Sequence, residues 1–555
     1  MAADDKGRAP DMKMHQRRAA AAWSERQKWS SVLADCYDWC MPWRRGGDGR
    51  TGASTMHLFD PTAVVSTMSG AGKLQQALFP PGQPFFRLRP GPVSQMIAAA
   101  ASDDARARDA AAVLTRQLDV LAQQVAPFFG TGEWDTAAAE LCLDLYAGTG
   151  VMLILPGDRA RPVRFLALPI EEVALESGPY GGTSGLFWRT RKSRREINAE
   201  FPQGRFPQTF LDLLAKEPEG LETLAQDIVA DGDGWTLIVS LDKVADQPPV
   251  ATFTARTKPF VAARYWRQPG QVMGVGPALA AAPMARTLNK AQELALKAAA
   301  IQMLGIWGYR PGATFNPDTA RLAHVLLPAL GWGQFWPVQS TGGVLGPDVA
   351  RLDLAQARVD LSSFIQQELR TQLQQILHDE RLPEGGATPR SASEIMARQA
   401  RLKTDYVGAF GRMIAEIVPV VVARVIEVLY DQKLIVTQAP LDQLLVTVEA
   451  VSPLAAAIRV DRHQPTIQGL ELSATLEGPQ GMARRFDLDR AMPELLGDLG
   501  VPPAFLRDGA QLQAFDEQAQ QAQEAAAVAQ AALDKPKDFA EALAPPEDAA
   551  GAPPA

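Results

Sequence analysis

The sequence predicts an α+β protein that is mainly α-helical. Apolar residues recur at three-and-four spacing over long stretches on both sides of a central segment, which is typical of amphipathic helices. The central segment, residues 151–266, instead contains short β-prone runs that turn residues separate. With 555 residues, the chain has material for about three to five packed units.

Four helices are predicted before the β-rich segment, each from its own apolar stripe. The first is a single helix that Pro42 ends. Asp60 and Pro61 supply an N-cap and a first-turn proline for the second. Gly148 is placed to end the fourth. The four predicted helices span residues 11–40, 61–79, 102–125 and 133–146.

The β-rich segment is predicted to form an antiparallel or mixed sheet rather than repeated βαβ units. Residues 193–232 interrupt the β-prone runs with short helices and a Gly-Asp turn cluster. The predicted strands are residues 151–155, 163–168, 186–190, 235–241 and 250–255.

A helix, a compact insert and a second helix are predicted next. Small residues on one face of the first helix favour close packing. The insert, residues 305–347, is rich in Gly, Pro and Trp and carries Trp307, Trp332 and Trp336. These tryptophans either anchor a partner protein or form a small core of the insert itself, and the sequence favours neither role. The two helices span about residues 278–303 and 348–377.

The longest helix of the chain is predicted after a loop at residues 381–389. Ser391 and Glu394 form a capping box at its start, and its apolar stripe continues to about Tyr430. Pro419 lacks an amide donor and should kink this helix. A strand at residues 444–448, a helix at residues 511–533 and a disordered tail complete the predicted chain.

Charge and composition argue against several classes of protein. The net charge of -8 disfavours a tight clamp on nucleic acid, because affinity for phosphate depends mainly on Lys and Arg. Cys36, Cys40 and Cys142 cannot form a disulfide framework and fit a reducing cytoplasm. The polar N-terminus predicts no secretory peptide. Charges interrupt the longest apolar stretch, residues 414–429, so no membrane span is predicted.

No motif carries a complete set of catalytic or ligand-binding groups. Residues 47–52 match a dinucleotide fingerprint in letters, but a helix rather than a strand precedes them. Residues 70–73 lack the first glycine and the final hydroxyl of a phosphate loop. Cys36 and Cys40 lack a second pair of metal ligands, so core packing is their favoured role, and the five histidines form no local motif. We therefore predict no catalytic residue, no cofactor, no metal and no enzymatic activity.

One cluster of basic residues stands out at the end of a predicted strand. It is either a phosphate-facing patch or an exposed loop or subunit contact. The acidic balance of the rest of the chain favours the second interpretation. The cluster consists of Arg189, Arg191, Lys192, Arg194 and Arg195.

Four stretches, in sequence order, carry a resemblance to a known family. Residues 58–88 contain an early helix that ends in a hydrophobe, two prolines and an aromatic. Residues 258–292 contain Pro-Phe, Arg-aromatic, Gly-x-Gly-Pro and Leu-Asn, and residues 390–402 contain a Ser-Ala-x-Glu-Ile helix start. Residues 448–459 contain Ser-Pro-Leu-Ala. In order and spacing, these stretches resemble the head-to-tail connector (portal) protein family of short-tailed, T7-like bacteriophages.

The resemblance implies a non-enzymatic subunit of a dodecameric ring at one vertex of a viral capsid. The ring would be a channel for packaging and ejecting double-stranded DNA. The implied partners are the terminase large subunit, a tail adaptor, and the major capsid and scaffolding proteins, with no membrane. The protein is then expected in the virion, and in the host cytoplasm during assembly. Two alternatives stay open: another ring or tail adaptor protein of the virion, and a hydrolase whose active site is assembled from distant residues.

The resemblance also implies a portal-type division of the chain. Arg381 and Arg390 are candidate DNA contacts in the channel, and Trp307, Trp332 and Trp336 are candidate partner contacts in the clip. The implied regions are N-terminal helices with an α+β wing (1–277), antiparallel stem helices (278–304 and 347–378), a clip (305–346), a channel loop (379–391), a long kinked spine helix with a following strand (392–453), a helical crown (454–533) and a disordered tail (534–555).

Overall fold

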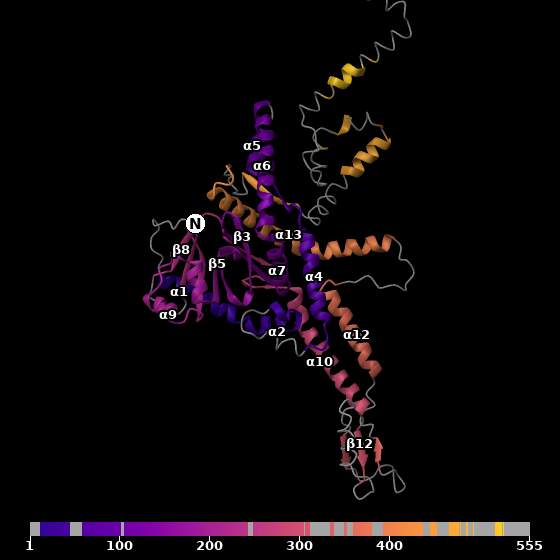
Figure 1. Cartoon of the computed structure of the whole chain (residues 1–555). Helices are drawn as coiled ribbons and strands as arrows, with labels where there is room; N and C mark the ends of the chain where they lie inside the picture. The colour runs from indigo at the N-terminus through magenta and orange to yellow at the C-terminus, as the bar shows by residue number, and fades with distance from the viewer. Residues whose placement is uncertain are drawn as a thin grey trace, which may run out of the picture. The chain divides into compact units, whose positions relative to one another are not determined.

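The computed structural model divides the chain into two compact units, residues 1–455 and residues 456–555. All the labelled elements in Figure 1 belong to the first unit. No helix among the described residues is long and apolar enough to cross a bilayer. The structure describes residues 12–44, 58–100, 105–232, 234–241, 248–304, 306–310, 334–337, 349–351, 359–379, 392–436, 445–451 and 466–476, with shorter pieces up to residue 526.

The predicted N-terminal helix is in fact two helices, α1 (Met12–Gln27) and α2 (Ser30–Cys40). The amides of Lys28 and Trp29 donate to carbonyls three residues earlier, so the chain turns there. α1 buries Ala19 and Ala22 against the largest sheet, whereas α2 belongs to the main core. The prediction of one helix over residues 11–40 was wrong, because the two halves of its apolar stripe pack on different partners.

Four helices and a short 3-10 turn follow: η1 (Pro42–Arg44), α4 (Thr62–Leu78), α5 (Pro92–Ala100), α6 (Ala105–Thr131) and α7 (Trp134–Ala147). The Asp60 carboxylate accepts a hydrogen bond of 2.9 Å from the Thr62 amide at the start of α4, as predicted. Gly148 follows α7, also as predicted. α6 continues beyond the predicted end at Val125 because Phe129, one turn later, packs into the aromatic core. α5 was not predicted.

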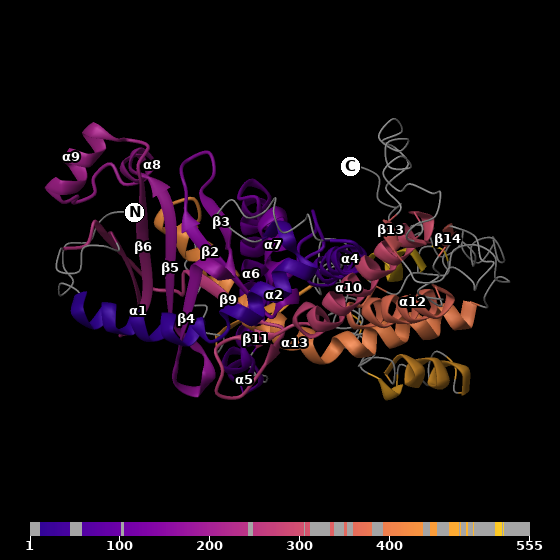
Figure 2. The ribbon, with the colours of Figure 1, turned by 90° about the horizontal axis from the view of Figure 1, so that it is seen from below.

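The largest sheet is antiparallel, with strand order β4-β5-β6-β7-β8, which confirms the predicted kind of sheet. Figure 2 shows α1 beside β4. β6 was missed because Gln226 and Asp227 in its middle are polar, yet both are buried. The elements here are η2 (Ile170–Glu172), β4 (Val173–Ser177), η3 (Pro179–Gly181), β5 (Thr183–Ser193), α8 (Arg194–Glu200), α9 (Gln208–Lys216), β6 (Leu221–Asp231), β7 (Gly234–Leu241) and β8 (Ala251–Ala255).

A second antiparallel sheet, with order β3-β2-β9, lies in the main core. Its strands are β2 (Thr149–Pro156), β3 (Val163–Leu168) and β9 (Phe260–Arg264). α7 packs on β2, and the long helix α13 (Ala392–Asp431) packs on β9 and β2. Two short antiparallel pairs join β1 (Phe86–Pro90) to β15 (Val446–Ala450), and β10 (Trp266–Arg267) to β11 (Gly274–Val275).

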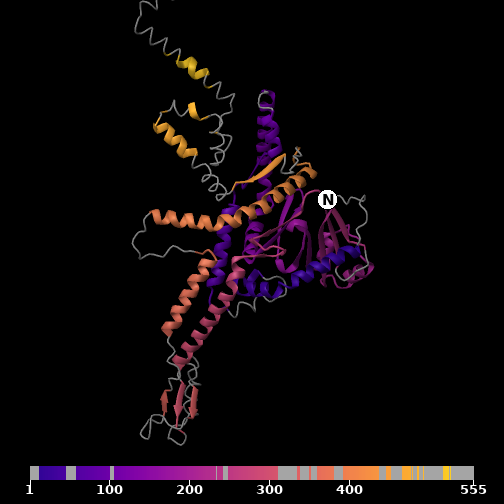
Figure 3. The same ribbon diagram turned by 180° about the vertical axis from the view of Figure 1, so that it is seen from behind.

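Two helices, α10 (Pro277–Leu304) and α12 (Val359–Ile376), lie side by side (Figure 3). Between them in the sequence lies a three-stranded sheet of β12 (Ile306–Tyr309), β13 (Gln334–Pro337) and β14 (Val349–Arg351). β12 is in the middle, parallel to β13 and antiparallel to β14. The second helix was predicted from residue 348, which was wrong, because residues 349–351 complete this sheet instead.

α13 ends at Asp431, next to the predicted end at Tyr430, and it contains Pro419. The kink at Pro419 stays a prediction. Ser391 of the predicted capping box and the predicted loop at residues 381–389 lie outside the described residues. In the C-terminal unit, residues 466–476 and 517–523 are helical. The predicted tail, residues 534–555, lies outside the described residues as well.

Candidate functional site at the base of the paired helices

Buried polar contacts fix the paired helices α10 and α12 to α4. We call this set of contacts the anchor. It runs along the second half of α12 and the first two-thirds of α4, and it joins three helices that are far apart in the sequence. The side chains of the anchor are Asp60, Ser66, Ser69, Lys73, Asn289 and Arg370, together with Asp379.

An ion pair between Asp60 and Arg370 forms the first half of the anchor. Arg370 Nε and Nη2 donate to the same oxygen, Asp60 Oδ2, at 2.9 and 2.8 Å. The other oxygen of Asp60 accepts from the Thr62 amide, and Asp60 is only 5% exposed. Both carboxylate oxygens are therefore satisfied, which a buried charge requires.

Asn289 connects α10 to the same point. Its Oδ1 accepts hydrogen bonds from the backbone amides of Phe59, at 2.7 Å, and Asp60, at 3.2 Å. Arg370 also donates to Gln292 Oε1 on α10 at 3.3 Å. The segment that leads into α4 is thus held by one side chain from each of the paired helices.

Asp379 forms the second half of the anchor, just after α12. Its side chain is almost fully buried, and its two oxygens accept from Ser66 Oγ at 2.9 Å and from Ser69 Oγ at 2.7 Å. Lys73 Nζ lies 3.5 Å from the same carboxylate and donates to the His378 carbonyl at 3.2 Å. The chain therefore enters residues 380–391, the remainder of the predicted channel loop, from a fixed point on α4.

A close crossing of two glycine-containing segments sets the start of α10. Gly148 has φ 134°, and a Cβ there would overlap the Gly274 carbonyl oxygen. A Cβ on Gly276 would overlap the Tyr146 carbonyl oxygen and would come within 2.7 Å of the Gly148 amide nitrogen. Only glycine permits this approach, so the Gly-x-Gly-Pro run positions the first turn of α10 against the end of α7.

Acid should loosen the anchor. Burial alone would raise the pKa of Asp60, but hydrogen bonds from Thr62 and the charge of Arg370 outweigh it and lower that pKa below its usual value. The ionised carboxylate of Asp60 therefore contributes its full stabilisation at pH values above about 3.9, the pKa of Asp in the unfolded chain. This contribution to the free energy of unfolding is lost as the pH falls through the lower pKa of Asp60 in the folded chain. In Asp60→Asn, the protection of amides in α4 and α12 near the anchor against hydrogen exchange, expressed relative to the unfolded chain at the same pH, should already be low at neutral pH. Wild-type protection should fall to that level only in acid, and equal protection of the two proteins at neutral pH would contradict this role.

The predicted site residues are only partly within the described structure. Trp307 lies on β12 in register with Phe335, and Trp336 lies on β13 in register with Gly308. The two tryptophans thus occupy neighbouring strands of the insert sheet. Trp332, Arg381 and Arg390 lie outside the described residues. Their proposed contacts with partners and DNA stay predictions.

The basic cluster at the end of β5 is largely paired with acidic side chains of this chain. Arg189 bonds to Asp227, Lys192 to Glu200, Arg194 to Glu222 and Arg195 to Glu219. Arg194 is buried, so its guanidinium is turned into the protein. These pairs disfavour a phosphate-facing patch. The cluster lies on β5 and at the start of α8, so the interpretation as an exposed loop was wrong, and a subunit contact stays a prediction.

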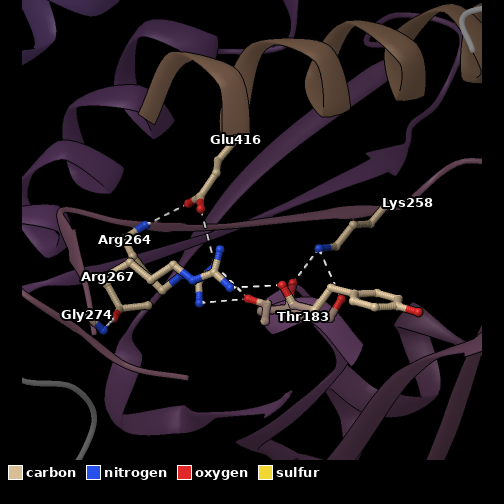
Figure 4. A network of polar contacts seen from close by, with 9 residues as sticks. Thr183, Lys258, Arg264, Arg267, Gly274 and Glu416 are labelled. Atoms are coloured by element: carbon tan, nitrogen blue, oxygen red, sulfur yellow. Dashed lines mark hydrogen bonds and ion pairs between the residues drawn. The ribbon is translucent and has the colours of Figure 1, made fainter. Parts of the chain in front are cut away.

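A second polar network joins the largest sheet to α13 (Figure 4). Arg264 on β9 donates to Glu416 on α13 and to the Gly181 carbonyl, each at 3.2 Å. Arg267 donates to the Tyr180 carbonyl at 3.1 Å. Lys258 donates to Thr183 and lies 4.4 Å from the centre of the Phe260 ring. Arg264 and Arg267 thus hold the η3 turn, in which Tyr180 has a positive φ of 63°, and Lys258 holds the first residue of β5.

The motifs considered for chemistry occupy structural positions where they are described. Residues 70–73 lie inside α4, so they form helix rather than a phosphate-binding loop. Cys36, Cys40 and Cys142 are buried free thiols in the main core, in agreement with the favoured packing role. Within the described ranges, no three His, Cys, Asp or Glu side chains gather as metal ligands would. Residues 47–52 lie outside the described residues.

A family comparison identifies the chain. The model of the bacteriophage head to tail connecting protein family matches residues 13–506. The chain belongs to this family. Solved structures similar to this head to tail connecting protein include a chain from the virion of a native gene transfer agent particle, with 12% identity, 76% of this chain and 89% of that chain covered, and a TM-score of 0.31. Another is a chain from the neck of the native particle computed with C12 symmetry. The match has 12% identity and a TM-score of 0.32, and it covers 82% of this chain and 95% of that chain. A comparison with curated protein sequences found no significant match.

The anchor of this head to tail connecting protein was missed in the sequence, although signals for it were present. Asp60 was predicted only as a helix cap, and Arg370 and Asp379 were not singled out. Asp60 and Asn289 both lie in stretches that carried the family resemblance, residues 58–88 and 258–292. These two stretches meet at the anchor, where Asn289 Oδ1 accepts from the amides of Phe59 and Asp60.

Proposed function

We propose that this head to tail connecting protein is the portal subunit, which forms a ring-shaped channel for double-stranded DNA at one capsid vertex. The observation that carries the proposal is the pair α10 and α12, which the anchor holds against α4 and which a small three-stranded sheet connects in the sequence. Copies of such a hairpin around an axis build a tube without any catalytic group. The proposed ring is a dodecamer.

The paired helices have the dimensions and the surface that this role needs. α10 has 28 residues, which corresponds to about 42 Å of helix. Leu294 and Phe364 are 55% and 68% exposed in the single chain, and Leu296 and Ile365 are also exposed. Apolar side chains of this size favour burial against a partner, and neighbouring copies in a ring would cover them.

The other regions are assigned by their positions along the chain. Residues 278–304 and 359–378 would form the stem. Because residues 349–351 belong to the insert sheet, the insert at 305–358 would be the clip that meets the terminase large subunit and later the tail adaptor. The body formed by residues 1–277 would be the wing, in contact with capsid and scaffolding proteins. Residues 379–391 would be the channel loop and residues 454–533 the crown. We further propose a short-tailed phage as the source of the particle, and no enzymatic activity.

The charge of the chain supports a channel through which DNA slides. The net charge is -8, and the basic cluster at the end of β5 is largely paired within the chain. Weak attraction between wall and phosphate allows DNA to move in both directions. Arg381 and Arg390 would be two basic residues beside an otherwise acidic channel, where they would contact DNA phosphates.

Complementation of a phage that lacks this gene tests the proposal. Without the protein, no DNA-filled heads should form, and the wild-type gene should restore them. The Arg381→Ala/Arg390→Ala double variant should slow packaging, because two phosphate contacts are lost. Restriction analysis of packaged DNA over time gives the rate, with Arg159→Ala/Arg205→Ala, which removes two exposed arginines on the wing, as a matched control. Filled heads without the protein would overturn the proposed function, whereas unchanged packaging by the double variant would exclude only these DNA contacts.

A further inference from the structure

The side of α10 that faces away from α12 carries two lysines and a leucine. Gln292 of α10 accepts a hydrogen bond from Arg370 of α12 at 3.3 Å, so this side of α10 faces its partner helix. Lys290 and Leu294 are each two positions from Gln292, and at about 100° per residue they lie on the opposite side of α10. Lys297, three positions after Leu294, shares that side. We call Lys290, Leu294 and Lys297, whose exposed fractions are 63%, 55% and 63%, the outer face of α10.

The outer face of α10 has more positive than negative charge around it. Lys290 and Lys297 donate to the two oxygens of one carboxylate, Glu293, at 2.8 and 2.5 Å. One acidic group thus serves two cations. Arg286, the remaining charged residue of α10, is also basic and lies 3.9 Å from Asp35 on α2. A surface that offers a carboxylate beside an apolar side chain would therefore complement this face.

The side of α12 that faces away from α10 carries such groups. Gln366 Nε2 donates to the Ala291 carbonyl at 3.3 Å, so Gln366 faces α10. Phe364 and Glu368 are each two positions from Gln366 and lie on the opposite side of α12. Phe364 is 68% exposed, and Glu368 is exposed and has no ion pair within the part of the chain that the structure describes. We call Phe364 and Glu368 the outer face of α12.

The two outer faces lie at matching heights along the paired helices. α10 leads to the insert and α12 returns from it, so the helices are antiparallel (Figure 3). Counted from the hydrogen bond that joins the helices, Leu294 and Phe364 lie three and two residues toward the insert. Lys290 and Glu368 lie one and two residues in the other direction. With a rise of about 1.5 Å per residue, the members of each pair differ in height by only about 1.5 Å.

We infer that the outer face of α10 docks on the outer face of α12 of the neighbouring copy, with Leu294 against Phe364 and Lys290 bonded to Glu368. This inference rests on the proposed function, because it names the subunit contact of the proposed ring. A second copy is the occupant because the two faces complement each other in charge and in apolar groups. They also lie on opposite sides of the helix pair, as a closed ring requires. Rotation about an axis along the pair changes no heights, so residues of equal height meet.

Reversing the charges of the pair tests the inference. Glu368→Lys should raise the protein concentration at which half of the chains are assembled by at least about tenfold, because the repulsion recurs at every contact of the ring. Lys290→Glu should have the same effect. The double variant Lys290→Glu/Glu368→Lys should recover most of the loss, because it restores the pair with the opposite polarity. Native mass spectrometry measures assembly, and circular dichroism checks that each exposed substitution leaves the fold intact.

Mixing the two single variants separates a contact between copies from one within a chain. In an equal mixture, rings in which the variants alternate restore an opposite-charge pair at every contact, so assembly should recover although neither variant assembles well alone. The mixed rings should contain equal numbers of the two chains. Lys216→Glu, which reverses an exposed charge on α9, is the matched control and should assemble as wild type does.

Neutral variants keep the test open if a reversed charge prevents folding. Lys290→Gln and Glu368→Gln should each weaken assembly, and the double neutral variant should lose no more than the weaker single one, because both remove the same pair.

Three outcomes would overturn the inference. Unchanged assembly by both charge-reversed variants would show that Lys290 and Glu368 do not meet. Absence of recovery in both the double variant and the mixture would show that each residue acts on assembly separately. Normal rings of Lys290→Glu that package DNA more slowly would place the outer face of α10 in the channel instead. Failure of the wild-type chain to form any ring would contradict the proposed function itself.

Discussion

Substituting Gly276 with alanine is expected to prevent the chain from folding. A Cβ at this position would overlap the Tyr146 carbonyl oxygen, and the amide nitrogen of Gly148 would be only 2.7 Å away. Both neighbours are backbone atoms, which cannot rotate away as a side chain can. The free energy of unfolding should fall by more than about 4 kcal/mol, a loss that few single substitutions cause. Soluble yield and urea denaturation followed by circular dichroism measure the effect.

Gly72→Ala is the matched control for this substitution. Gly72 lies inside α4, and an added Cβ there would meet no atom within 4 Å. Alanine costs less conformational entropy than glycine in a helix, so this variant should be as stable as wild type or more stable by about 0.5–1 kcal/mol. If Gly276→Ala unfolded at the wild-type urea concentration, the crossing of residues 146–148 and 274–276 would not determine the start of α10.

The second large effect concerns assembly rather than folding. Phe364→Glu should abolish rings and leave a folded, dissociated chain. Phe364 is 68% exposed on α12, so a carboxylate there meets water in the single chain and costs little. In the proposed ring, the same carboxylate would be buried against a neighbouring copy, which costs several kcal/mol per contact. Native mass spectrometry should show no closed ring, while the circular dichroism spectrum should remain that of wild type.

The control for Phe364→Glu adds the same charge away from the paired helices, because side chains three positions apart on α12 would share one face. Gln203 is exposed in the turn after α8 and already polar, so Gln203→Glu should assemble as wild type does. Rings formed equally well by Phe364→Glu would show that the exposed apolar side chains of the paired helices are not a subunit contact. Loss of the native spectrum in that variant would mean that Phe364 contributes to the fold instead.

The elements that the sequence predicted well are those whose signal is local. α7 is followed by Gly148 as predicted, because its apolar stripe and its terminating glycine lie within one segment, and α13 ends next to the predicted Tyr430, where its apolar stripe ends. An antiparallel or mixed sheet was also predicted from β-prone runs and turns, and the largest sheet is antiparallel. β6 was missed because its polar Gln226 and Asp227 are buried and Asp227 pairs with Arg189 on the neighbouring strand.

The features that were missed depend on contacts between distant residues. Arg370 and Asp60 are 310 positions apart, and no local pattern could pair them. The turn between α1 and α2 contains neither proline nor glycine, and it forms because α1 packs on the largest sheet while α2 packs on the main core. β14 consists of residues 349–351 only, and its pairing with β12 across the insert decides its conformation. In each case tertiary contacts decided the structure where local sequence was ambiguous.

The most direct test of the account is the mass and shape of the particle that the purified chain forms. Native mass spectrometry and negative-stain images of the full chain should show a closed dodecameric ring with an axial hole. Such a ring would be the central consequence of the paired helices and of membership in the head to tail connecting protein family. A stable monomer or dimer over a wide range of protein and salt concentration would contradict the proposed portal.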